Sequence, residues 1–148
     1  MGYAIPGSLG AALANPGVRI LSVTTDGSFS MACGELETAV RLGLPITFVQ
    51  LTNGSFGWIK MLQHIYYERR YFSVDIGTVD AVAVARGFGV PANRVTSRNT
   101  LERQLIASRE ADGPAFIEVT VPDMIELDPP VASWTAALTG EDTVRPVY

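Results

Sequence analysis

The sequence predicts an α/β fold, a three-layer and doubly wound arrangement in which helices cover both faces of a mostly parallel β-sheet. Three observations carry this prediction. Helix-like and strand-like segments alternate along most of the 148 residues, as right-handed βαβ crossovers require. The strand-like runs at 46–51 and 115–121 are largely apolar, which is typical of strands that are covered on both faces. Glycine, asparagine or proline separates most of these segments, and these residues favour turns.

The first part of the chain is predicted to alternate helix, strand, helix and strand. Small residues over 4–14 predict a helix, which an Asn-Pro-Gly sequence ends. A strand over 19–24 is followed by a sharp turn at 25–28 and then by a helix over 34–42. The apolar run at 46–51 is the second strand.

The second part of the chain is predicted to continue this alternation. The helix near residue 100 is expected to begin at a cap that Asn99 or Thr100 forms. The predicted elements are a short helix that starts within 55–66, a helix over 79–88, a strand over 93–96, a helix over 100–111 and the strand over 115–121.

The character of the sequence changes after the last strand. Residues 1–122 form the predicted domain, and residues 123–148 form a C-terminal tail that prolines and glycine interrupt. The only helical candidate in the tail is 131–138. We expect the tail to be mobile or packed on a partner.

Composition excludes several classes of function. The net charge is −4 and no basic run is present, which argues against a nucleic-acid partner. No apolar run approaches the roughly 18 residues that a membrane span needs. The single cysteine, Cys33, suits a reducing compartment, so that the cytoplasm is the expected location.

Two polar turns follow the first two predicted strands, Asp26-Gly27-Ser28 and, 27 residues later, Asn53-Gly54-Ser55. Ligands of open α/β sheets bind at the carboxyl ends of parallel strands. Asp26 supplies a carboxylate, Asn53 an amide oxygen and Ser55 a nearby carbonyl, and hard oxygen ligands of this kind suit Mg²⁺ bound to a diphosphate. Because Asp-Gly and Asn-Gly are also common turn dipeptides, two ordinary strand-ending turns remain the alternative.

The two turns and their spacing resemble the thiamine-diphosphate motif, a Gly-Asp-Gly followed at a similar distance by Asn-Asn. The similarity extends to the stretches at 1–6, 10–14, 34–39 and 51–57, which resemble the acetolactate synthase branch of the thiamine-diphosphate-dependent enzymes. The matching part of the chain resembles the C-terminal, diphosphate-binding domain of such an enzyme. The implied fold is the thiamine-diphosphate-binding fold, without its N-terminal strand.

The resemblance implies thiamine diphosphate and Mg²⁺ as cofactors. Mg²⁺ would be bound by the side chains of Asp26 and Asn53 and by the backbone carbonyl of Ser55. The resemblance implies no catalytic residue within the chain. The implied cofactor-binding residues are Met1, Thr25, Asp26, Gly27, Ser28, Asn53, Ser55, Phe56 and Gly57.

The remaining roles follow the family motif position by position. Gly27 and Ser28 would hold the diphosphate, and Phe56 and Gly57 would line the same site. Met1 falls on the bulky residue that props the cofactor into its bent shape, which brings its imino group next to the reactive carbon.

The chain departs from the family pattern at three positions. Thr25 replaces the first glycine of Gly-Asp-Gly, and Thr52 replaces the first asparagine of Asn-Asn. Leu62 occupies the position at which acetolactate synthases have a substrate-selecting tryptophan. The third departure leaves the choice between decarboxylase and carboligase open.

The implied activity is decarboxylation of a 2-oxo acid, with release of the aldehyde or its condensation with a second carbonyl compound. The domain that binds the pyrimidine ring and carries the activating glutamate has no counterpart here, and Glu35 and Glu37 are poor substitutes for it. The implied partners are therefore a pyrimidine-binding domain or subunit and further copies of the same chain. Two alternatives remain, the β subunit of a two-chain 2-oxo-acid decarboxylase and a non-catalytic assembly or regulatory module.

Two residues with reactive side chains are assigned no catalytic role. His64 is the only histidine, which excludes a metal–histidine cluster within the chain, and a surface-loop position is expected for it. Cys33 has no base near it in the sequence and is expected to contribute to packing.

Overall fold

The computed structural model describes residues 1–77, 79–128, 131, 135–136 and 140. Its residues group into two compact units, one made of 1–52 with 78–121 and the other of 53–77 with 122–148. The boundary proposed from the sequence, at residue 122, stays a prediction. The tail helix predicted at 131–138 falls mostly outside the described residues.

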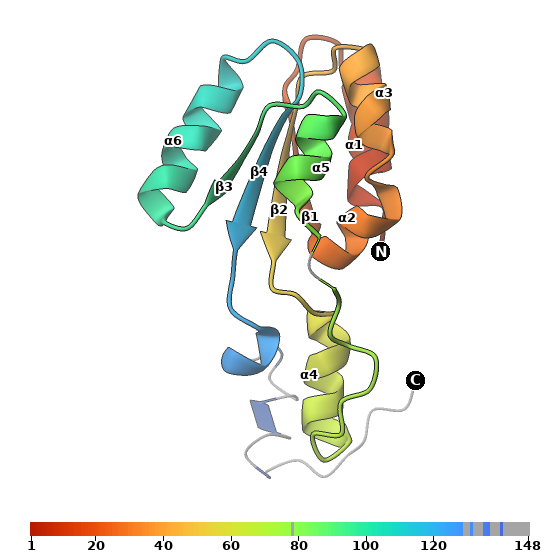
Figure 1. Cartoon of the computed structure of the whole chain (residues 1–148), viewed down its shortest axis with the longest axis vertical. Helices are drawn as coiled ribbons and strands as arrows, with labels where there is room; N and C mark the ends of the chain where they lie inside the picture. The colour runs from red at the N-terminus through yellow and green to blue at the C-terminus, as the bar shows by residue number, and fades with distance from the viewer. Residues whose placement is uncertain (78, 129–130, 132–134, 137–139, 141–148) are drawn as a thin grey trace. The chain divides into compact units, whose positions relative to one another are not determined.

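The first unit is built on a four-stranded parallel sheet in the order β1-β2-β4-β3 (Figure 1). Thr25 pairs with Leu51, and Leu51 pairs with Val119, so that three of the strands end at one edge of the sheet. The strands are β1 (Ile20–Thr25), β2 (Ile46–Thr52), β3 (Ala92–Val95) and β4 (Ala115–Thr120).

Helices cover both faces of this sheet, which confirms the predicted three-layer α/β class. In Figure 1 α6 lies on one side of the strands, and the other helices of this unit lie on the opposite side. These helices are α1 (Ala4–Ala14), α2 (Asp26–Ala32), α3 (Glu35–Arg41), α5 (Ala81–Gly87) and α6 (Arg98–Arg109).

The core lies on both faces because side chains alternate along each strand. Phe116 of β4 packs against Phe29 of α2, with ring centroids 5.3 Å apart and a tilt of 54°. The next residue, Ile117, faces the opposite side, where Val49 and Leu105 of α6 complete a smaller cluster. This burial on both faces explains why the sequences of β2 and β4 are largely apolar at consecutive positions.

Two local predictions were wrong. The sharp turn expected at 25–28 is the start of α2, since Thr25 is extended (φ −122°, ψ 165°) and the helix begins at Asp26. An acidic residue in the first turn is favoured by the helix dipole. The cap of α6 is Ser97, which has an extended backbone and whose hydroxyl accepts a hydrogen bond from the Thr100 amide at 3.3 Å.

The second unit contains helix α4 (Gly57–Tyr66) and a short 3₁₀ helix, η1 (Met124–Glu126). An isolated antiparallel bridge joins Ser55 to Asp75. Helix α4 starts two residues after the beginning of the range predicted for it. Among the described residues, no helix combines the length and apolar character of a transmembrane segment.

Candidate functional site

Asp26 is placed at the carboxyl end of β1 as the first residue of α2. Its side chain is buried, with the residue 8 % exposed, and its Oδ1 accepts a hydrogen bond from the Gly27 amide at 2.8 Å. Gly27 is also buried, Ser28 is half-buried, and Thr25 and Met1 are exposed.

Asn53 begins a tight loop in the second unit. Its Oδ1 accepts a hydrogen bond from the Ser55 amide at 3.3 Å, which forms an Asx turn. Gly54 has φ +73°, a left-handed conformation that favours glycine. Two backbone hydrogen bonds, Phe56 N to Val74 O at 2.8 Å and Ile76 N to Gly54 O at 3.0 Å, then hold the loop in place.

The hydroxyl of Ser55 is buried and finds no hydrogen-bond partner among the described residues, although the residue is only 4 % exposed. A buried polar group without a partner costs about 1–3 kcal/mol. This loop therefore offers a polar atom that a bound group can satisfy.

Gly57 is required by close packing. A Cβ at this position would lie 2.5 Å from Cγ of Met124 and 3.0 Å from Nδ2 of Asn53. The glycine thus lets η1 pack directly against the start of α4, and the loop that carries Asn53 lies at the same place.

Lys60, the only lysine of the chain, joins three segments of the second unit. Its Nζ lies 2.6 Å from Oδ2 of Asp123 and 2.7 Å from Oδ1 of Asp75, and its side chain is 12 % exposed. Hydrogen bonds to these carboxylates, that of Asp123 first, raise the pKa of Lys60 above its ordinary value. Since Asp75 is the bridge partner of Ser55, Lys60 ties α4 to the loop next to it. This contact was not predicted from the sequence.

Replacing Lys60 with methionine is expected to lower the free energy of unfolding by about 1–3 kcal/mol, because a largely buried Asp123 carboxylate loses its charged partner. The measurement is urea unfolding followed by tryptophan fluorescence. Arg41→Met is the control, since the Arg41–Glu37 pair is exposed and should contribute less than about 0.5 kcal/mol. Equal losses in the two variants would contradict the account.

His64 lies in α4 and is half-buried, which corrects the expectation of a surface-loop position. Its Nδ1 lies 2.6 Å from the hydroxyl of Tyr71. Burial, and to a lesser extent the charge of Arg69, lowers the pKa of His64 below its ordinary value of 6.5. At neutral pH the imidazole is therefore mostly uncharged, and Nδ1 can accept a hydrogen bond from the Tyr71 hydroxyl.

The pKa of His64 predicts a loss of stability in acid. A histidine whose pKa is lower in the folded state binds protons more readily when unfolded, so that its contribution is present above pH 6.5 and is lost as the pH falls through and below 6.5. Urea unfolding at pH 7.5, 6.5 and 5.5 measures this effect. His64→Gln should lose less stability over the interval than the original chain, and an identical pH dependence in both would refute the assignment.

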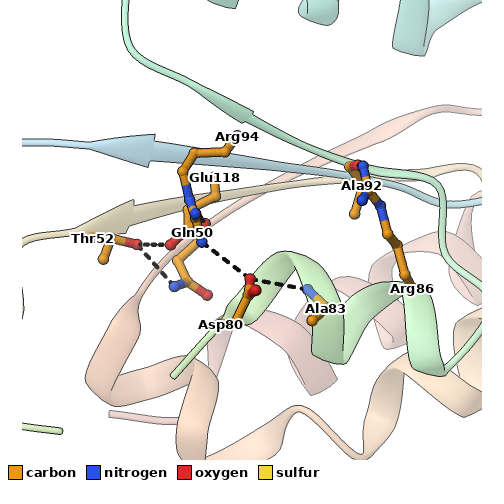
Figure 2. A network of polar contacts seen from close by, with 8 residues as sticks. All are labelled: Gln50, Thr52, Asp80, Ala83, Arg86, Ala92, Arg94 and Glu118. Atoms are coloured by element: carbon orange, nitrogen blue, oxygen red, sulfur yellow. Dashed lines mark hydrogen bonds and ion pairs between the residues drawn. The ribbon is translucent and has the colours of Figure 1, made fainter. Parts of the chain in front are cut away.

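A cluster of polar side chains lies inside the first unit, on the face of the sheet that α5 covers. We call Gln50, Thr52, Glu118 and Arg94 the polar row (Figure 2). Gln50 Nε2 donates to Thr52 Oγ1 at 3.0 Å, and Thr52 Oγ1 donates to Glu118 Oε1 at 3.0 Å. Arg94 Nε donates to Glu118 Oε2 at 2.7 Å.

The polar row is deeply buried at its centre. Gln50 is 1 % and Glu118 2 % exposed, whereas the side chain of Arg94 is 49 % exposed. Arg94 also pairs with Asp80, which caps α5 through the Ala83 amide. The hydrogen bond with Glu118 is the main cause of a raised pKa of Arg94. The row was not predicted from the sequence, although Gln50 and Glu118 each interrupt an apolar strand.

The predicted site residues divide between the two units, with Met1 and 25–28 in the first and 53–57 in the second. Cys33 packs against the main core, as expected. No group of three His, Cys, Asp or Glu side chains in the described ranges is arranged to hold a metal ion.

Comparison with known families identifies one whose sequence pattern matches residues 1–119. It is described as the thiamine pyrophosphate enzyme, C-terminal TPP binding domain. The match covers the candidate residues of both units, from Met1 to Gly57.

The similar proteins include an acetolactate synthase of Bacillus subtilis, 37 % identical over 121 residues, which are 82 % of this chain and 21 % of that protein. The acetolactate synthase large subunit of Parasynechococcus marenigrum is 34 % identical over 123 residues, 82 % of this chain and 20 % of that protein. The chain thus spans about a fifth of the length of these relatives.

Among solved structures, a thiamine diphosphate-dependent 4-hydroxybenzoylformate decarboxylase of Rhodococcus jostii superposes with a TM-score of 0.78. It is 26 % identical in sequence, and the alignment covers 82 % of this chain and 23 % of the other. Sequence and fold therefore point to the same group of proteins.

Proposed function

Because the chain belongs to the family of C-terminal thiamine-pyrophosphate-binding domains, we propose that it binds thiamine diphosphate and Mg²⁺ for an enzyme that acts on 2-oxo acids. The observation that carries this proposal is the buried carboxylate of Asp26 at the carboxyl end of β1. Ligands of parallel α/β sheets bind at this edge, and Mg²⁺ in such sites typically takes one or two carboxylates together with phosphate oxygens.

The proposed Mg²⁺ ligands are the Asp26 carboxylate, the Asn53 amide oxygen and the Ser55 backbone carbonyl. These residues fit the group chemically, since all three offer hard oxygen atoms. The buried Ser55 hydroxyl, which lacks a partner among the described residues, is a polar atom of the kind that a bound diphosphate or its water shell would satisfy.

The other candidate residues have binding roles in this proposal. Gly27 and Ser28 hold the diphosphate, and Thr25 takes the place of the first motif glycine. The residues that line the cofactor are Met1, Phe56 and Gly57. When bound, thiamine diphosphate supplies the carbanion chemistry, and the residues of this chain bind and orient it.

We place the domain in a larger assembly, because the chain spans about a fifth of its relatives. A pyrimidine-binding domain or subunit with the activating glutamate and further copies of the chain are the proposed partners. The relatives support an acetolactate-synthase-like carboligase or a decarboxylase of 2-oxo acids such as benzoylformates. The single cysteine supports a reducing, cytoplasmic location.

Calorimetric titration of thiamine diphosphate into the full chain tests the binding proposal. We expect saturable heat with Mg²⁺ present and none after EDTA has removed the metal, because the diphosphate is held through the metal. Thiamine without its phosphates is the control ligand and should bind far more weakly. Cofactor binding that persists in EDTA would contradict the proposed metal site, and absence of binding would favour a non-catalytic module.

A further inference from the structure

We propose that a second copy of this chain pairs with the free edge of β1 in the antiparallel direction, so that the sheets of the two copies become continuous. The inference rests on the proposed association with further copies of the chain and names the surface through which they meet. It does not depend on cofactor binding. In the strand order β1-β2-β4-β3, β1 and β3 are the edge strands, and no other described strand pairs with the outer edge of either.

The backbone of β1 directs the hydrogen-bonding groups of alternate residues to its two sides. The Ile20 amide donates to the Pro45 carbonyl at 2.9 Å, which places the groups of Ile20 on the side of β2. Because these groups alternate along a strand, the other even-numbered positions of β1 also face β2. The odd-numbered positions Leu21, Val23 and Thr25 therefore direct their amides and carbonyls to the free edge.

The sequence of β1 lacks the features that usually keep edge strands from pairing, which are charges, proline, bulges and short length. Its six residues include no charged residue, proline or glycine, and the side chains of Leu21 and Val23 are exposed. The other edge strand, β3, is only four residues long and exposes Asn93 and Arg94. Of the two edges, β1 is thus the one that favours pairing with another strand.

A second copy is favoured as the partner because the edge is complementary to itself. When Ser22 lies opposite the Ser22 of the other copy, Leu21 lies opposite Val23 of the other copy, and symmetry repeats this pair. Each such pair exchanges two hydrogen bonds, since both residues direct their backbone groups to the edge. Their apolar side chains then contact one another on the same face of the sheet. A two-fold contact of this kind closes at two copies, so that a dimer and not a filament is expected.

The charges around β1 also favour antiparallel pairing of two copies. Each chain has a net charge of −4, but β1 itself carries no charge, so that the strands meet without like charges opposite one another. Arg19 precedes the strand and Asp26 follows it. An antiparallel pair places the basic end of one strand beside the acidic end of the other, whereas a parallel pair would place like charges side by side.

The test is sedimentation velocity of the full chain over a series of concentrations, with and without Val23→Lys. We expect a reversible equilibrium between monomer and dimer in the original chain. The variant should raise the dissociation constant of the dimer by at least about tenfold, because it places a charge in each copy next to the two-fold axis. Val23 is 53 % exposed, so that the fold should be retained, which circular dichroism checks.

Ile106→Lys is the matched control. It makes the same apolar-to-lysine change at a residue of α6 that is 57 % exposed, away from the edge of the sheet, and it should leave the dissociation constant unchanged. If Val23→Lys fails to fold, hydrogen exchange in the original chain provides the test. The Leu21 and Val23 amides should exchange more slowly at high protein concentration, whereas the Ser22 and Thr24 amides, which face β2, should not depend on concentration.

Four outcomes would overturn the inference. They are a chain that stays monomeric at every concentration, assembly that continues beyond the dimer, a dimer that Val23→Lys leaves intact or Ile106→Lys weakens equally, and exchange of the Leu21 and Val23 amides that does not depend on concentration. These measurements contain neither thiamine diphosphate nor Mg²⁺. Their failure would leave the proposed cofactor binding intact, and failure of the calorimetric titration would leave the dimer intact.

Discussion

Replacing Asp26 with asparagine is expected to weaken Mg²⁺-dependent binding of thiamine diphosphate by at least about 100-fold. The substitution keeps the shape of the side chain but removes the only charge in the proposed ligand set. Loss of a group that merely supports a metal ligand costs about 10- to 100-fold in affinity, so that loss of a charged ligand should cost no less. Calorimetric titration in excess Mg²⁺ measures the change.

Asp112→Asn is the matched control for this experiment. It makes the same change of charge at an exposed position in the turn before β4 and should leave the affinity unchanged. Circular dichroism of both variants checks that the fold is retained. An Asp26→Asn variant that binds the cofactor as well as the original chain would remove Asp26 from the metal site.

Replacing Phe116 with alanine is expected to lower the free energy of unfolding by about 3–5 kcal/mol. Phe116 is 1 % exposed at the centre of the sheet, and its ring packs against that of Phe29. The substitution removes this contact and leaves a cavity between the sheet and α2. Because α2 begins at Asp26, we also expect weaker cofactor binding. Urea unfolding and calorimetry measure the two effects.

Phe72→Ala makes the same chemical change at a side chain that is 82 % exposed, and it should alter stability by less than about 0.5 kcal/mol. Comparable losses in both variants would show that the contact between Phe116 and Phe29 does not organise the core. If Phe116→Ala leaves the free energy of unfolding unchanged, the packing described between β4 and α2 would be contradicted.

The elements that the sequence predicts well are those whose signal is local. The run Ile46–Thr52 is largely apolar and has apolar residues on both sides of the strand, and this pattern predicts burial on both faces. The position of Asp26 at the end of a strand was also predicted from a local signal, the strand-like run that directly precedes it. Its helical backbone was not, since Asp-Gly occurs both in turns and in the first turn of helices, and packing against the sheet decides between them.

The contacts that the sequence did not predict depend on register and on long-range packing. Thr52 and Glu118 are 66 residues apart, and Arg94 and Glu118 are 24 apart. The sequence of a single strand does not specify which of its residues will pair with which residues of the neighbouring strand. Lys60 likewise contacts Asp123 only after the chain has passed through residues 78–121 of the first unit. In both cases the sequence showed a polar residue within an apolar segment. Such a residue indicates that a polar partner exists, but it does not identify that partner.

The most direct test of the central claim is a crystal structure of the full chain with thiamine diphosphate and Mn²⁺, which replaces Mg²⁺ and can be located by anomalous scattering. We predict a single strong peak that is coordinated by oxygens of Asp26, Asn53 and Ser55 and of the diphosphate. A metal-bound diphosphate that does not contact Asp26 would contradict the account, as would a crystal grown with both ligands that contains neither.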